Sequence, residues 1–180
     1  MTMIHPWHDV SVGEGAPSVV HAIIEIPKDS HIKYEMDKET GLLRLDRVLY
    51  SAVHYPGDYG FVPQTYWDDG DPLDILVLTN RPVVPMTLAE VRIIGVLRMI
   101  DGKEKDDKLI GVYEHDPRFS EFASIKDIPK HTLEEMKHFF ETYKQLQGKT
   151  CKVLDILDKD EAYKDIAIAQ KLYREKFKKK

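Results

Sequence analysis

The sequence predicts an α+β fold in which a mostly antiparallel β-barrel carries two main helices on its outside. Two observations support this prediction. From about residue 19 to 157 the chain consists mainly of short apolar or alternating segments separated by turn residues, a pattern typical of barrels and sandwiches. Two segments with helical periodicity lie in the C-terminal third, and helices that follow a run of strands pack against the sheet. We favour an OB-like barrel.

Length and composition limit the class of protein. The 180 residues suffice for a real core, and we predict a single domain over residues 1–180. The net charge of −5 argues against a general nucleic-acid-binding surface. A single cysteine permits no disulfide within the chain, as expected in a reducing compartment. No segment resembles a membrane span or a signal peptide, so we expect a cytoplasmic protein with no membrane partner.

The first strands are predicted in the N-terminal half. "VVHAIIEI" (19–26) is apolar and β-branched, and Pro27 ends it. "HIKYEM" (31–36) and "LLRLDRVL" (42–49) alternate around "DKETG", which indicates a hairpin. "DILVLT" (74–79) is an apolar run after a turn and predicts a buried strand.

Three further strands follow. "AEVRIIGVLRMI" (89–100) is long, and Gly95 inside it is a candidate bulge. "KLIGVY" (108–113) and "TCKVLDIL" (150–157) complete the set. Cys151 lies in the last of these strands, where we expect it to be a small buried hydrophobic residue.

Two helices are predicted. The first covers residues 131–148: Thr132 and Glu135 have the spacing of a capping box, and Gly148 ends it. The second covers residues 160–177 and presents one apolar stripe. The stripe consists of Ala162, Ile166, Ala169, Tyr173 and Phe177.

The segment "WDDGDPLDILVL" (67–78) places four carboxylates within seven positions, directly before the buried strand. Asp, Gly and Pro form turns, so a plain turn explains much of this composition. However, Asp69 and Asp71 are two residues apart and face the same side of an extended segment, while Asp74 lies at the mouth of the strand. Like charges this close repel unless a cation lies between them. Oxygen ligands alone favour Mg²⁺ or Mn²⁺.

Other charged and aromatic residues have ordinary structural explanations when taken singly. Asp101 and Asp106 lie in "MIDGKEKDDKL" (99–109), and a charged hairpin loop explains them, although they could share cations with the first cluster. Scattered basic and aromatic residues could be solvent-facing or core residues. These are Lys33, Arg47, Lys108, Lys144, Tyr55, Tyr59 and Tyr143.

Taken together, these residues resemble the soluble inorganic pyrophosphatases of family I, in the prokaryotic form. The hallmark Asp-x-Asp-Pro-x-Asp signature is present as "DGDPLD" (69–74). The supporting segments "IEIP", "IKYE", "LDR", "YPGDYGFVP", "DGKEKDDK" and "HFFETYK" occur in the family order, from about Val19 to Lys144. One departure is Gly102, which follows Asp101 where certain bacterial members carry an acidic residue.

The resemblance implies an OB-like barrel and an inorganic diphosphatase that hydrolyses pyrophosphate with several Mg²⁺ ions per site, with Mn²⁺ as an alternative. It also implies a homohexamer, because prokaryotic members are usually hexamers. The eukaryotic members are longer and form dimers, and this short chain resembles the prokaryotic form. The implied catalytic residues are then Asp71, as the base or orienter of a metal-activated water, and Tyr59, which tunes Asp71 or a nearby carboxylate. The implied metal ligands are Asp69, Asp74, Asp101 and Asp106, with Glu25 and Glu35 in outer positions. The implied substrate-binding residues are Lys33, Arg47, Tyr59, Lys108, Tyr143 and Lys144.

Three other classes of function stay open at this point. An OB-type nucleic-acid-binding module would need a positive groove with stacking aromatics. A non-catalytic divalent-metal-binding protein would explain the acidic turns but not the basic residues in family order. A Mg²⁺-dependent phosphohydrolase acting on nucleotides would need an evident element for stacking the base.

Overall fold

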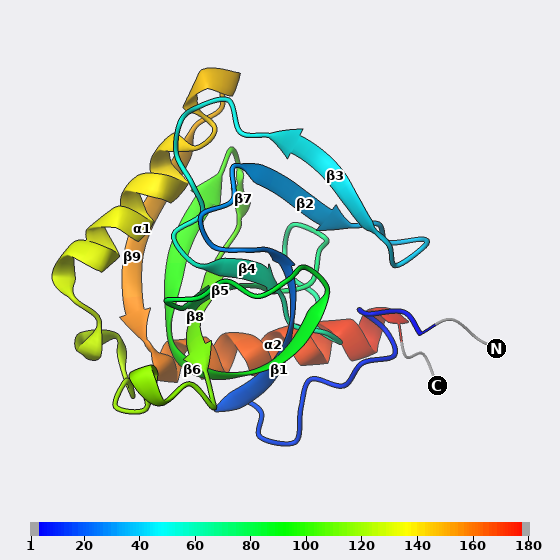
Figure 1. Ribbon diagram of the computed structural model, residues 1–180. Coiled ribbons are helices and arrows are strands. Elements are labelled where there is room, and N and C mark those ends of the chain that lie inside the picture. Colours follow the sequence, from blue (N-terminus) through cyan, green and yellow to red (C-terminus); the bar gives the residue numbers. More distant parts are fainter. Residues whose placement is uncertain (1–3, 178–180) are drawn as a thin grey trace.

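The computed structural model describes residues 4–177, and its centre is a closed ring of strands (Figure 1). The ring runs β1–β4–β5–β8–β6 and closes because β1 pairs with both β4 and β6. The β5–β8 pair is parallel, and the other pairs in the ring are antiparallel. The prediction of an OB-like, mostly antiparallel barrel is therefore confirmed. The ring strands are β1 Val19–Ile26, β4 Asp58–Phe61, β5 Asp74–Leu78, β6 Thr87–Asp101 and β8 Lys108–Tyr113.

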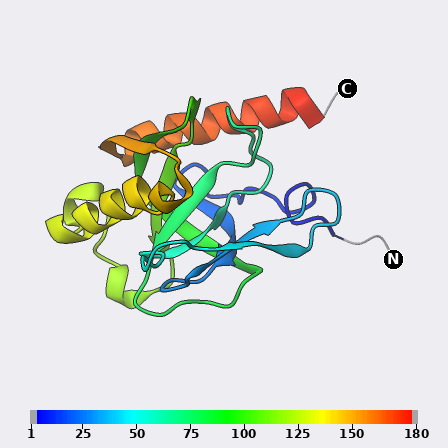
Figure 2. The same ribbon diagram turned by 90° about the horizontal axis from the view of Figure 1, so that it is seen from above.

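The remaining elements lie around this ring. Strands β2 (Ile32–Met36) and β3 (Leu43–Val48) form a separate hairpin. Strands β7 (Glu104–Lys105) and β9 (Cys151–Asp158) each pair with β6 in antiparallel orientation. Figure 2 shows helix α2 along one side of the barrel and the β2–β3 hairpin on the opposite side. The two helices are α1 Lys130–Thr142 and α2 Lys159–Phe177, and short 3₁₀ turns cover Pro117–Phe119, Ile125–Asp127 and Gln145–Gln147.

Each helix buries one apolar face against the sheet. Helix α1 buries Met136, Phe139 and Phe140 next to the ring strands. Helix α2 buries the predicted stripe from Ala162 to Tyr173, whereas Phe177 at its end is 40% exposed. The predicted stripe is therefore confirmed except at its last residue, where the helix extends past the sheet.

The start of α1 differs from the prediction. The helix begins at Lys130, and Pro129 before it offers no side-chain cap. Instead the Pro129 carbonyl accepts hydrogen bonds from the amides of Thr132 and Leu133. Thr132 thus lies within the first turn, and the predicted capping box is wrong. The helix also ends at Thr142, and Gly148, with φ of 71°, closes a separate 3₁₀ turn.

Two glycines shape the barrel strands. The pairing register between β6 and β8 shifts between Ile93 and Gly95, so the predicted bulge at Gly95 is confirmed. Gly60 lies in β4, a strand that the sequence analysis did not predict. A Cβ atom on Gly60 would lie 1.9 Å from the carbonyl oxygen of Ile23 on the neighbouring strand. Only glycine permits this approach, which lets the ring close at β1 and β4.

A buried ion network ties α2 to the barrel. Arg98 on β6 donates hydrogen bonds to Asp107 (2.7 Å) and to Asp165 of α2 (2.6 Å). Both carboxylates are buried. Asp107 also accepts the amide of Met99 at 3.1 Å, so the network fixes the start of β8 relative to β6. Asp106 and Lys108 flank Asp107, and the network therefore anchors two of the predicted site residues.

Candidate active site

Three carboxylates converge at one end of the barrel. One oxygen of each of Asp69, Asp74 and Asp106 lies within 4.8 Å of the others. Asp69 belongs to the loop before β5, Asp74 is the first residue of β5, and Asp106 precedes β8. Because β5 and β8 are parallel neighbours, their first residues reach the same end of the sheet. The sequence analysis predicted all three as metal ligands.

The loop before β5 is held by its own backbone. The amide of Trp67 donates to the carbonyl oxygen of Asp71 at 2.8 Å, and the amide of Asp71 donates to Asp69 Oδ1 at 3.0 Å. Gly70 has φ of 88°, which favours glycine at this turn. The segment is thus a turn, as its composition indicates, and the turn itself brings the carboxylates to the mouth of β5.

Burial and mutual repulsion raise the pKa values of several acidic groups. Burial, helped by the negative charge of Asp74, raises the pKa of Asp69 to about 7. The pKa of Asp74 is also raised, mainly by burial. Burial raises the pKa of Glu25 to about 8, although its Oε1 accepts the amide of Met36 at 2.6 Å. Carboxylates in this situation are stabilised in the charged form by a cation.

One such cation is the ammonium group of Lys108, which is 2% exposed. Its Nζ donates to Asp74 Oδ2 at 2.5 Å and also contacts Asp106. Tyr59 on β4 donates its hydroxyl hydrogen to the same Asp74 oxygen at 2.5 Å. Asp74 is therefore fixed from two sides by buried side chains. The residues fit divalent ions well, because the converging donor atoms of Asp69, Asp74 and Asp106 are all hard carboxylate oxygens.

Asp101 forms a second acidic position at the end of β6. Its carboxylate pairs with Lys144, and Cys151 Sγ donates to its other oxygen at 3.4 Å. Burial alone would raise its pKa, but the contact with Lys144 leaves the pKa of Asp101 below its ordinary value. Lys144 also lies over the ring of Tyr143, with Nζ 5.1 Å from the centroid.

The β2–β3 hairpin supplies further cations. Lys33 and Arg47 are cross-strand partners, and Lys33 pairs with Glu35. Arg47 donates from Nη1 to Asp46 at 2.5 Å. Its Nε and Nη2 atoms are buried and have no hydrogen-bond partner among residues 4–177. Unpaired guanidinium donors of this kind suit an anionic ligand.

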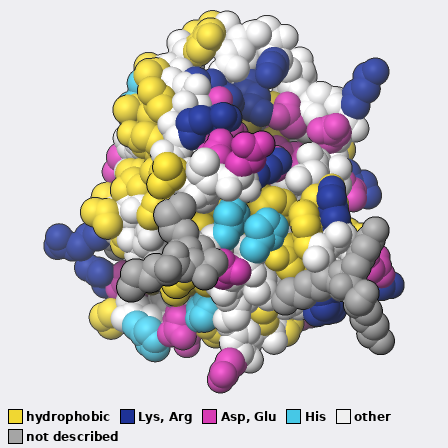
Figure 3. Space-filling model, turned by 90° about the vertical axis from the view of Figure 1, so that its right-hand side faces the viewer, with side chains coloured by type: hydrophobic (Ala, Val, Ile, Leu, Met, Phe, Trp, Pro, Cys, Tyr) yellow, Lys and Arg dark blue, Asp and Glu magenta, His cyan; other side chains and the backbone are white. Residues whose placement is uncertain are grey.

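All these groups surround a pocket of about 660 Å³. Every predicted site residue except Arg47 lines it, and Arg47 lies beside its lining residue Lys33. Tyr55 also lines it, with 2% exposure, so it is both a wall and a core residue. On the face drawn in Figure 3, basic and acidic side chains gather side by side in the upper half of the view.

The sequence analysis missed several residues that line this pocket. Lys38 and Arg44 come from the β2–β3 hairpin, and Glu104 comes from β7. Lys38 lies in "DKETG", which was interpreted only as a turn. Its local sequence carries no further signal, because its place over the pocket depends on how the hairpin packs against the barrel.

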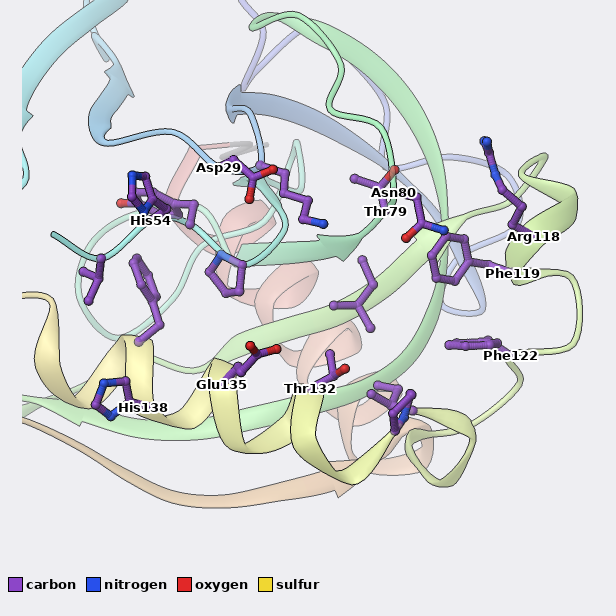
Figure 4. A pocket seen from close by; sticks show the side chains of 18 residues that line it. Asp29, His54, Thr79, Asn80, Arg118, Phe119, Phe122, Thr132, Glu135 and His138 are labelled. Atoms are coloured by element: carbon purple, nitrogen blue, oxygen red, sulfur yellow. The ribbon is translucent and has the colours of Figure 1, made fainter.

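A second pocket of about 660 Å³ (Figure 4) shares Tyr55 with the first pocket as a lining residue. Phe119 and Phe122 line it together with residues of α1, of which Thr132, Glu135 and His138 are labelled in the figure. Acidic residues do not converge there as they do around Asp74. The chemistry that the sequence predicts therefore belongs to the pocket at the barrel end.

The fold and the site define a class: an OB-like barrel protein whose acidic, metal-binding cluster faces cationic side chains suited to a phosphate anion. The family model described as inorganic pyrophosphatase matches residues 22–174. The chain belongs to the inorganic pyrophosphatase family. It is 49% identical over 176 residues to soluble inorganic pyrophosphatase 2 of Chlamydomonas reinhardtii, an alignment covering 98% of this chain and 92% of that protein. It is 48% identical to the soluble inorganic pyrophosphatase of Oryza sativa, covering 94% and 79% respectively.

Solved structures agree with this assignment. The inorganic pyrophosphatase of Thermus thermophilus superposes with a TM-score of 0.91 at 44% identity, covering 94% of this chain and 99% of that chain. That of Helicobacter pylori gives 0.88 at 45% identity, covering 92% and 98%. Only 71% of the longer Schistosoma japonicum chain is covered, at 26% identity and a TM-score of 0.88. The chain thus covers nearly the whole of the Thermus thermophilus and Helicobacter pylori chains, whereas the Schistosoma japonicum chain is longer.

Proposed function

We propose that this protein hydrolyses inorganic pyrophosphate to two phosphates with the help of divalent ions. One observation carries the proposal. The oxygens of Asp69, Asp74 and Asp106 converge in a pocket that is also lined by cationic groups of the hairpin and of the segment after α1. An anion made of two linked phosphates needs positive charge around it, and the converging carboxylates need cations between them.

Asp69, Asp74 and Asp106 would hold the central ions, and Asp101 with Asp106 would hold an ion on the substrate oxygens. We favour Mg²⁺, with Mn²⁺ as the alternative, because all donors are oxygens. Bound divalent ions supply two kinds of chemistry here: they lower the pKa of a bound water and neutralise phosphate charge. Glu25 on β1 and Glu35 on the β2–β3 hairpin would orient the inner residues.

Asp71 would take up the proton of the attacking water, or orient that water. Its carboxylate is outside the group of converging oxygens, although its amide is hydrogen-bonded to Asp69. It can therefore contact the water without being used as a ligand. Tyr59 supports this arrangement by holding Asp74 through its hydroxyl group.

Cationic and phenolic side chains would bind the phosphate groups. Arg47 is suited to a two-pronged hydrogen bond, because its unpaired Nε and Nη2 form one edge of the guanidinium. Lys33 and Lys144 would add charge from either side, with Tyr143 beside Lys144. Lys108 would contact the substrate from the floor of the pocket while it balances Asp74 and Asp106.

The experiment that tests this function is phosphate release from pyrophosphate, with and without Mg²⁺. We expect release only with the metal, and much slower release from nucleoside triphosphates. Equal activity on nucleotides would favour a nucleotide phosphohydrolase, and metal binding without release would favour a metal-binding protein. A salt-dependent shift of a single-stranded oligonucleotide, without turnover, would favour a nucleic-acid-binding barrel.

We also propose that residues 1–180 act as one domain and that the chain assembles as a cytoplasmic homohexamer. The hexamer is the state that the resemblance to the prokaryotic form implies, and the superposition with the Thermus thermophilus chain supports that resemblance. Among the residues that the structure describes, no helix is long and apolar enough to cross a membrane. Light scattering in solution tests the assembly, since a hexamer has six times the 20.9 kDa mass of the chain.

A further inference from the structure

The side chain of Asp71 has one cationic neighbour that the reaction outlined above does not use. Lys38 forms an ion pair with Asp71 Oδ1. Among residues 4–177 this is the only ion pair of Asp71, and Oδ1 is buried without another hydrogen-bond partner. The backbone of Asp71 is fixed by Trp67 and Asp69, but these bonds leave its side-chain rotation unrestrained. Lys38 supplies that restraint.

Lys38 itself is held by the turn of the β2–β3 hairpin. Asp37 Oδ1 accepts hydrogen bonds from the amide (2.9 Å) and the hydroxyl group (2.8 Å) of Thr40. The amide of Gly41 donates to the carbonyl oxygen of Asp37 at 2.8 Å. The amide of Met36, at the end of β2, donates to the buried Glu25. The backbone that carries Lys38 is therefore tied both within the turn and to the barrel.

A segment far away in the sequence supports the same turn. Residues 5–9, here called the N-terminal strap, lie next to the end of α2 in Figure 1. Trp7 is 3% exposed, and its Nε1 donates to the carbonyl oxygen of Thr65 at 2.8 Å. His8 Nδ1 lies 2.7 Å from the hydroxyl group of Tyr173. These contacts fix the strap on the body of the molecule.

The strap then contacts the turn directly. His5 Nε2 lies 3.1 Å from the carbonyl oxygen of Lys38, to which it donates a hydrogen bond. Gly41 has φ of 69°, and a Cβ atom there would lie 2.9 Å from Cδ of Pro6. The strap and the turn therefore approach as closely as a glycine allows. The contacts form one chain from the N-terminal strap through Lys38 to Asp71.

We propose that Lys38 is a positioning residue for Asp71, and that the N-terminal strap holds Lys38 in place. By binding Oδ1, the ammonium group fixes the rotation of the carboxylate and leaves Oδ2 for the attacking water. The inference rests on the proposed function, because it needs Asp71 to act on that water. It adds a residue and a distant segment that the sequence pattern of the site does not include.

Steady-state hydrolysis of pyrophosphate by the full chain with saturating Mg²⁺ tests the proposal. We expect Lys38→Met to lower kcat by about tenfold or more with KM within about twofold, since a misplaced reacting group can cost on the order of a hundredfold. Lys38→Arg should recover most of the turnover, because it keeps the charge. Lys103→Met removes an exposed lysine from another loop and is the matched control. Unchanged kcat in Lys38→Met, or a raised KM with unchanged kcat, overturns the proposal.

Two more variants separate this inference from the function on which it rests. In an Asp71→Asn background, Lys38→Met should have no further effect on kcat. If Asp71→Asn alone keeps full turnover, the role proposed for Asp71 is wrong. If Asp71→Asn is inactive while Lys38→Met is fully active, only the positioning role is wrong. His5→Ala should lower kcat in the wild-type background but not in Lys38→Met, and equal losses in both backgrounds would overturn the role of the strap.

Discussion

Lys108 and Asp74 are register partners in the parallel β5–β8 pair, and the Lys108 ammonium group lies 2.5 Å from Asp74 Oδ2. The lysine is 2% exposed and also contacts Asp106. Its pKa is raised, because the attraction of Asp74 and Asp106 outweighs the cost of burial. The ion pair is thus part of the barrel wall, and it keeps the two like charges of Asp74 and Asp106 together.

Lys108→Met should therefore destabilise the metal-free protein more than the metal-loaded protein. Leaving buried carboxylates without their partner typically costs about 3 kcal/mol or more. Added Mg²⁺ takes over part of this charge balance. Thermal unfolding with and without Mg²⁺ should show a lower Tm for metal-free Lys108→Met and a larger Mg²⁺-induced rise than in the wild type. The exposed Lys105→Met is the control, and an equal Mg²⁺-induced rise in all three proteins would contradict this account.

Asp106→Asn should weaken metal binding. A ligand that binds only the folded state stabilises it by about 2.7 kcal/mol at a concentration of one hundred times its Kd. Losing one of three converging carboxylates should lower the Mg²⁺ affinity and with it a large part of that stabilisation. Calorimetric titration with Mg²⁺ measures the affinity directly. Asp68→Asn is a matched control, because Asp68 belongs to the same acidic segment but is exposed and lies outside the converging oxygens. Similar Mg²⁺ affinity in both variants would rule out Asp106 as a ligand.

Arg47→Lys should raise KM for pyrophosphate by about tenfold, because it keeps the charge but loses the planar fork that binds two oxygens. The buried, unpartnered Nε and Nη2 are the atoms that this change removes. Steady-state kinetics over a range of pyrophosphate concentrations measures the effect, and the exposed Arg81→Lys serves as the control. An unchanged KM and kcat would place Arg47 outside the substrate-binding set.

Much of the barrel could be predicted because its strands are apolar and bounded by turn residues. β4 could not, since Asp58–Phe61 has four buried residues in a row and shows no alternation. Its position depends on Gly60 approaching the carbonyl group of Ile23, which is a tertiary contact. The start of α1 was also missed, because Thr132 and Glu135 have the right spacing while Pro129 already ends the preceding segment.

The acidic part of the site could be predicted because Asp69, Asp71 and Asp74 are close together in the sequence. The cationic residues of the site could be predicted only from the resemblance, because Lys33, Arg47 and Lys144 are far apart in the sequence and each has an ordinary structural explanation. Neither the acidic pattern nor the resemblance predicted Lys38 as a residue of the site. Its side chain reaches Asp71 only because the hairpin folds over the loop before β5, and no local pattern encodes that packing.

Arg98→Met should loosen α2 and the start of β8, since it leaves Asp107 and Asp165 buried without their shared guanidinium. Burial already raises the pKa of Asp165, which is 5% exposed, despite its bonds to Arg98. Removing the guanidinium should raise that pKa further. A carboxyl group whose pKa is higher in the folded state loses its contribution to stability as pH rises through that pKa.

The destabilisation caused by Arg98→Met should consequently be larger at pH 8 than at pH 5, where Asp165 more readily takes up a proton. Urea unfolding at both values measures it, with an expected loss of about 3 kcal/mol at the higher pH. Adding Asp165→Asn to Arg98→Met should recover part of the loss and flatten the pH dependence, because the amide cannot ionise. A loss independent of pH in the single variant would show that packing of the arginine stem, rather than its charge, holds α2 to the barrel.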